Sequence, residues 1–72
     1  MPLTGKQFQI GTPTFVIESH DGKRIAVTVP AGAIIKVVSG PRHNDRLVDV
    51  LWEGRVVQMF ALDLNERGTE IK

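Results

Sequence analysis

The stretch from residue 55 to residue 62 constrains the fold more than any other, because Arg-Val-Val-Gln-Met-Phe-Ala-Leu is typical of a β-strand that is apolar on both faces. A chain of 72 residues has enough core to cover only one of these faces. An exposed apolar patch with an aromatic side chain usually marks an interface or a ligand site, and we expect a second copy of the chain to cover the other face. Because side chains alternate across a strand, one face carries Val57, Met59 and Ala61, and the other carries Val56, Gln58 and Phe60.

This argument predicts a closed homo-oligomer, and a tetramer with two-fold axes is the form we expect. A domain of this size buries only about 60% of the surface that its unfolded chain exposes, so association would add stability. Other means of stabilisation are not indicated. The chain has no cysteine, and its two histidines, His20 and His43, lack a metal-ligand pattern. The sequence therefore predicts no metal site, and the lack of cysteine fits a reducing cytoplasm.

Charge and hydropathy argue against several classes of protein. Nine basic and eight acidic residues are interspersed and give a net charge of +1, which offers no polybasic footprint for nucleic acid. No apolar run approaches the roughly 18 residues of a membrane span, and no signal segment is recognisable. We therefore expect a cytoplasmic protein that does not contact membranes.

Turn chemistry divides the chain into short strands. Residues 1–12 show little pattern and are expected to form a flexible arm, which leaves residues 13–72 as the domain. Asp21-Gly22 is a strong hairpin signal because both positions tolerate positive φ, and Glu53-Gly54 is a second turn. Residues 40–45 have loop composition, and residues 62–64 suit a single 3₁₀ turn. Strands are expected at 15–18, 24–29, 33–39, 46–52, 55–62 and 69–71.

The fold class indicated is all-β: a small SH3-like barrel of about five short strands with a 3₁₀ turn before the last one. The strand at 33–39 is also apolar on both faces, so we expect it too to be buried on both sides. An open meander that dimerises through its edges is the alternative.

Motifs for nucleophilic, phosphate-binding or dinucleotide chemistry cannot be argued from the sequence. Trp52 is interpreted as a core or interface residue, Met59 as core, and residues 42–46 as a solvated loop. Gln58 differs, because an uncharged polar side chain on an apolar face needs partners there. A ligand is one such partner, and a symmetry mate or backbone group at an interface is the other.

A resemblance to a known family supports the first alternative. Val57-Gln58-Met59-Phe60 resembles the Val-Gln-Ile-Tyr motif of the type II dihydrofolate reductases, which are trimethoprim-insensitive enzymes found on mobile elements. Residues 47–49 keep, without a gap, the spacing of the family's Ala-Val-Glu strand to that motif. Residues 22–25 resemble its Gly-Asp-Arg-Val, and residues 64–67 its Leu-Glu-Arg ending, so the resemblance spans roughly residues 22–71. Members of the family are SH3-like barrels that form homotetramers around one central pore.

The resemblance implies NADPH-dependent reduction of 7,8-dihydrofolate to tetrahydrofolate in such a pore, a step of one-carbon metabolism, and with it trimethoprim resistance. It implies catalytic roles for Gln58, Met59 and Phe60, with nicotinamide and pteridine stacking against Gln58 and its symmetry mates. Met59 would act through its backbone, and Phe60 lacks the hydroxyl of the family's tyrosine. The cofactor-binding residues implied for NADPH are Val57, Gln58, Met59, Phe60 and Lys23.

Counting without a gap from Gln58 puts the family's pore lysine at Lys23, whereas matching the opening of the first strand puts it at Val27. Lys23 is the first choice and Lys36 the second for the basic residue at the pore. Glu53 stands where the family has an interface histidine, so acid-driven dissociation is not expected. Orientation of the two rings alone supplies about 7–11 kcal/mol of a barrier, and the cofactor carries the reaction, so no nucleophile is needed. The alternative function is a non-catalytic SH3-like binding or assembly module with a protein or RNA partner.

Overall fold

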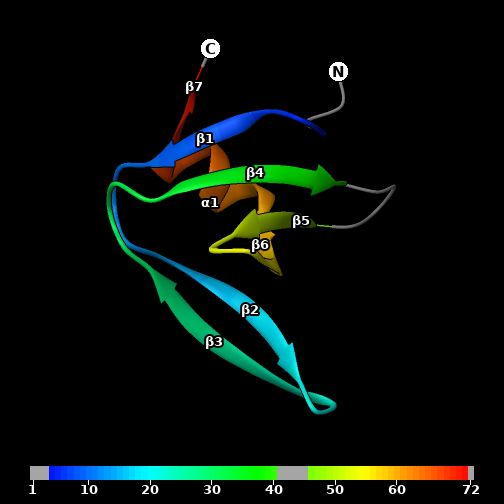
Figure 1. Cartoon of the computed structure of the whole chain (residues 1–72). Coiled ribbons are helices and arrows are strands. Elements are labelled where there is room, and N and C mark those ends of the chain that lie inside the picture. Colours follow the sequence, from blue (N-terminus) through cyan, green and yellow to red (C-terminus); the bar gives the residue numbers. More distant parts are fainter. Residues whose placement is uncertain (1–3, 41–45, 72) are drawn as a thin grey trace.

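The computed structural model describes residues 4–40 and 46–71 of the chain. One antiparallel sheet of seven strands has the order β3-β2-β6-β5-β4-β1-β7, and a single short helix precedes the last strand (Figure 1). The elements are β1 (Gln7–Ile10), β2 (Thr14–His20), β3 (Lys23–Val29), β4 (Ile34–Ser39), β5 (Leu47–Trp52), β6 (Arg55–Phe60), α1 (Ala61–Arg67) and β7 (Gly68–Ile71).

Two tight hairpins carry the local folding signals of the sequence. Asp21 and Gly22 have φ values of 50° and 76° between β2 and β3. Glu53 and Gly54 have 52° and 74° between β5 and β6. Two successive positive φ values match the twist of the flanking strands, which is why such two-residue turns suit hairpins. Both predicted turns are confirmed.

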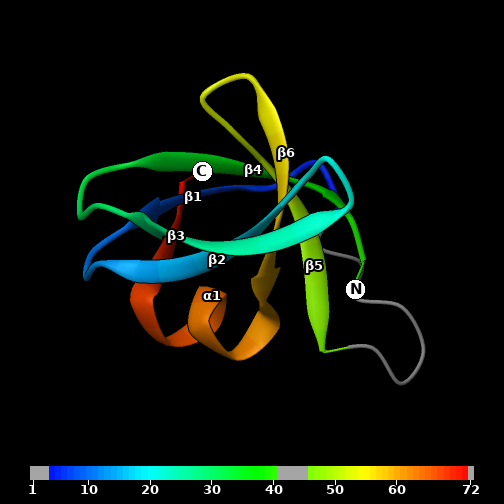
Figure 2. The same ribbon diagram turned by 90° about the horizontal axis from the view of Figure 1, so that it is seen from below.

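The core lies on one face of the sheet, which we call the inner face, and the sheet bends around it. Buried side chains come from every strand except β7, and Leu64 of α1 also belongs to the core. Figure 2 shows α1 on one side of the bent sheet. The core residues are Phe8, Ile10, Val16, Val29, Ile35, Val37, Val48, Val50, Trp52, Val57, Met59 and Leu64. The predictions that Trp52 and Met59 belong to the core are confirmed.

The all-β class is confirmed, but the sheet is open and not closed into a barrel. Its outermost strands, β3 and β7, do not pair with each other in the described ranges 4–40 and 46–71. There are seven strands where a barrel of about five was expected. Six of them correspond to the predicted strand ranges, and the seventh is β1, near the start of the chain.

The expectation of a flexible arm over residues 1–12 is wrong for residues 7–10. These residues form β1, which pairs with β4 on one side and β7 on the other. Phe8 and Ile10 enter the core, while Gln7 and Gln9 face solvent, so the polar residues are the exposed half of an alternating strand. Residues 1–3 lie outside the described residues, and so does most of the predicted loop at 40–45, including the cluster at 42–45 and His43.

The predicted 3₁₀ turn at 62–64 is instead the middle of the helix α1, and the strand predicted to reach residue 62 ends at Phe60. Leu64 anchors the helix in the core. Asp63 and Arg67 form an i,i+4 ion pair at 3.8 Å, and the N–H of Gly68 bonds to the Leu64 carbonyl. Within the described residues, no helix is long and apolar enough to cross a membrane.

The β2–β3 hairpin reaches away from the rest of the sheet (Figure 1). Its seven pairs from Thr14–Val29 to His20–Lys23 are continuous, but β2 pairs with β6 only through Val16–Met59 and Ile17–Gln58. The tip of the hairpin therefore depends on side chains for further attachment to the sheet.

Candidate functional site

Gln58 lies near the middle of the face of the sheet that turns away from the core, which we call the outer face. On its own strand the neighbours on this face are Val56 and Phe60, both exposed. In the adjoining strands it pairs with Ile17 of β2 and Asp49 of β5. The predicted division of this strand into a core face and a second face is thus confirmed.

The amide of Gln58 has a partner within its own chain. Nη2 of Arg24 donates a hydrogen bond to Oε1 of Gln58 across 2.6 Å. Arg24 comes from the projecting part of β3, two strands away, and shares the outer face because it pairs with Ser19 in the hairpin. A charge-assisted bond of this length fixes which way the amide points, so its Nε2 group is turned away from Arg24.

Other polar groups of the outer face either form hydrogen bonds within the chain or lie at the periphery of the face. Ser39 Oγ donates to Asp49 Oδ2 at 2.7 Å, next to Gln58 in the sheet. Lys36 of β4 pairs with Leu51 of β5 and is exposed. The centre of the face therefore presents an arginine, an amide and a carboxylate whose bonds are made inside the chain.

The four motif residues are divided between the two faces. Val57 and Met59 bury their side chains in the core, so only their backbone could serve a ligand. Gln58 is half-buried and Phe60 exposed, both on the outer face. The structure thus places two of the predicted site side chains together on an accessible surface.

Lys23, the predicted cofactor-binding lysine, does not join them. It pairs with His20 beside the hairpin turn and alternates with Arg24, so its side chain belongs to the opposite face from Gln58. Arg24 is the basic residue beside Gln58, and the sequence analysis missed it. The Asp21-Gly22 turn fixes Ser19 as the residue opposite Arg24 in the hairpin. The register of β2 against β6, which brings Arg24 to Gln58, has no local sequence signal.

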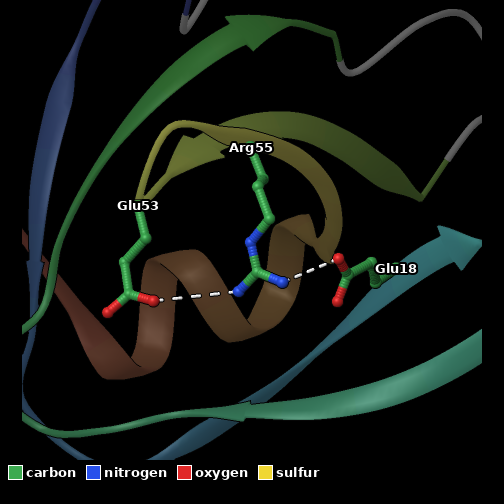
Figure 3. A network of polar contacts seen from close by, with 3 residues as sticks. All are labelled: Glu18, Glu53 and Arg55. Atoms are coloured by element: carbon green, nitrogen blue, oxygen red, sulfur yellow. Dashed lines mark hydrogen bonds and ion pairs between the residues drawn. The ribbon is translucent and has the colours of Figure 1, made fainter.

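The inner side of the same hairpin has a second arginine contact. Nη1 of Arg55 lies 2.7 Å from Oε1 of Glu18, and Nη2 lies 3.7 Å from Oε2 of Glu53, so the guanidinium bridges two carboxylates (Figure 3). Its central carbon also sits 5.3 Å from the ring centroid of Trp52, within cation–π range. One arginine on each face thus ties the hairpin to β6.

Exposed apolar side chains are concentrated on the outer face. Nine large apolar residues of the described ranges are exposed, and only Ile25 and Leu62 lie elsewhere. The strand at 34–39 is accordingly covered on its inner face alone within one chain. The seven on the outer face are Phe15, Ile34, Val38, Leu51, Val56, Phe60 and Ile71.

Among residues 4–40 and 46–71, no three acidic or histidine side chains cluster in a way that could hold a metal ion. Around Gln58, at the centre of the outer face, the groups available for hydrogen bonding are its amide, the Arg24 guanidinium and the Asp49 carboxylate, with apolar side chains beside them. No protein-family model matches the chain, and neither the curated proteins nor the solved structures include a match.

Proposed function

We propose that this chain is a self-assembling β module whose outer face, around Gln58, is the contact surface between copies. The observation that carries the proposal is the concentration of exposed apolar side chains on this one face. Contiguous apolar patches of this kind mark interaction sites on soluble proteins. The fold proposed for the module is an open variant of the SH3-like barrel, with a helical turn before its last strand.

The polar groups at the centre of the outer face support a second copy as the occupant. Covering a polar group that lacks a partner is costly. Here Arg24 already bonds Gln58, and Ser39 already bonds Asp49, so a second copy could cover these groups without leaving their main contacts unmade. The face also carries both signs of charge, which lets identical faces oppose each other.

The exposed surface of the chain is large enough for such an interface. A stable interface of standard size buries about 800 Å² on each partner, roughly a sixth of the 4921 Å² that this chain exposes. The strands β2, β6 and β5 lie next to one another in the sheet, so their outward side chains form a continuous surface. An interface centred on β6 would use Phe15, Val56, Leu51 and Phe60.

Val56→Asp is expected to abolish association through the outer face and leave each copy folded, because Val56 is 58% exposed in the single chain and central to the proposed interface. A buried unpaired polar group costs about 2–7 kcal/mol, and every ~1.4 kcal/mol is tenfold in affinity. Sedimentation velocity over a micromolar concentration series measures the effect.

The matched control is Leu62→Asp, since Leu62 is 64% exposed but lies on α1, away from the outer face. It should associate like the parent chain. A parent chain that sediments as a monomer throughout the series, or a Val56→Asp variant that associates as strongly as Leu62→Asp, would refute the proposal.

A second candidate function is dihydrofolate reduction inside the assembly, and the position of Gln58 favours it. If four copies met around the outer face, Gln58 and Phe60 of each would line the enclosed space, as the resemblance to the type II reductases implies. NADPH would be the cofactor, and Arg24 would be the basic group nearest the amide. The chain itself would position the two rings, while the cofactor supplies the hydride and solvent supplies the proton to N5.

The assay for this candidate is NADPH oxidation on addition of dihydrofolate, with trimethoprim in excess. The reductase candidate predicts turnover that persists with trimethoprim and disappears in Val56→Asp, whose outer face would not assemble. If the chain is oligomeric but shows no turnover, the reductase candidate is rejected and the assembly module remains.

A further inference from the structure

The free edge of β3 is the longest unpaired backbone in the described sheet. β3 has seven residues and pairs only with β2, whereas β7 at the other edge has four. Proteins usually protect such edges by shortening, bulging or covering them. Toward the turn both faces of β3 are open as well, since residues 23–26 are exposed, and Ile25 on the inner side is 48% exposed because the hairpin overhangs the core.

The hairpin turn fixes which residues present their backbone to this edge. In a two-residue hairpin the residues that flank the turn form a hydrogen-bonded pair, here His20 and Lys23. Bonding direction alternates along the strand. Arg24, Ala26 and Thr28 therefore direct their N–H and C=O groups to the free edge, with Ala26 in the middle of the seven residues.

The side chains of β3 fit an antiparallel copy of the same strand. An antiparallel arrangement centred on Ala26 sets Arg24 opposite Thr28 of the other copy, and Lys23 opposite Val29. Both basic residues lie at one end of the strand, so the like charges of the two copies end up apart. A parallel arrangement would place them side by side, which destabilises a strand pair.

We propose that β3 pairs with β3 of a second copy, antiparallel and centred on Ala26, to form one sheet of fourteen strands. This contact is separate from the outer face and does not depend on it. The two-fold axis of such a pair stands perpendicular to the sheet, so both copies turn their outer faces to the same side. The pairing therefore doubles the apolar surface that a further pair of copies would cover, and the two contacts together generate a tetramer with two-fold axes.

Single-cysteine variants test the register, because the chain has no cysteine of its own. In Ala26→Cys the introduced thiol meets its own symmetry mate. Residues paired in this way have Cα atoms about 5.5 Å apart, inside the roughly 4.4–6.8 Å that a disulfide spans. Under oxidised glutathione we expect a covalent dimer on a non-reducing gel.

Thr28→Cys is the matched control, an exposed position on the same strand and face. In the proposed register its mate lies four residues further along, about 13 Å away, so it should form no covalent dimer under the same conditions. Ala26→Cys in the Val56→Asp background should cross-link as well as in the parent chain. That result separates the edge contact from the outer-face contact.

Equal cross-linking of Ala26→Cys and Thr28→Cys, or none by either, would overturn the proposal. A second measurement avoids thiols altogether. Ala26→Asp and Ala26→Lys are each combined with Val56→Asp. Each double variant alone should sediment as a monomer, because like charges would meet at the edge contact. An equimolar mixture of the two should sediment as a dimer. A mixture that stays monomeric would also overturn the pairing, whatever the state of the outer face.

Discussion

Met59→Ala is expected to destabilise the fold by about 2–5 kcal/mol, the range for truncating a large buried side chain. Met59 is fully buried, with 0% exposure, and pairs with Val16 on one side and Val48 on the other. Truncation therefore opens a cavity between the hairpin and the rest of the sheet. A chain of 72 residues has a total stability of only several kcal/mol, so much of the variant should be unfolded at 37 °C. Urea denaturation followed by circular dichroism measures the change.

Leu62→Ala serves as the control, because it truncates an apolar side chain that is 64% exposed on α1. Its free energy of unfolding should stay within about 0.5 kcal/mol of the parent, as surface substitutions usually do. Were Met59→Ala as mild as Leu62→Ala, the assignment of Met59 to the core would be wrong. Gln58 would then have to lie on the inner face.

If the assembled chain is the proposed dihydrofolate reductase, Gln58→Ala is expected to lower its kcat by at least about a hundredfold, the penalty for losing the positioning of two reacting rings. Because the amide is half-buried on the outer face and has Arg24 as its one hydrogen-bond partner among the described residues, its removal should cost little stability, about 0.5–1.5 kcal/mol. Steady-state kinetics on the assembled protein, with trimethoprim present, supplies the measurement.

Arg24→Ala is the comparison variant for Gln58→Ala. It breaks the same hydrogen bond but keeps the amide, so kcat should fall far less, while KM for both polyanionic ligands rises and loses its dependence on salt. Equal loss of kcat in the two variants would show that Gln58 acts only by holding the hairpin against β6. The outer face would then be a contact surface without catalysis.

The local features of the fold could be predicted because their causes are local. Asp21-Gly22 allows positive φ at both positions, which sets the β2–β3 hairpin and its register without reference to the rest of the chain. Strict alternation likewise separated Met59 from Gln58. These two signals are sufficient to define two hairpins and the face on which the candidate site lies.

Features that depend on distant contacts could not be predicted in the same way. β1 is short and half polar, and only its ladders with β4 and β7 identify it as a strand. The helix α1 follows a strand that is apolar to its end, and it begins at Ala61 because Leu64 reaches the core from there. The contact of Arg24 with Gln58 requires the register of β2 against β6, which packing decides.

The position of β1 between β4 and β7 also has a consequence for the order in which the chain folds. The hairpins β2–β3 and β5–β6 close short loops and can form early, since contacts between near neighbours cost little chain entropy. The ladder from Gln7–Ile71 to Ile10–Gly68 joins the first strand to the last one. During synthesis, this side of the core therefore cannot close over Phe8 and Ile10 until α1 and β7 have been made. Until then an apolar strand stays exposed to other chains.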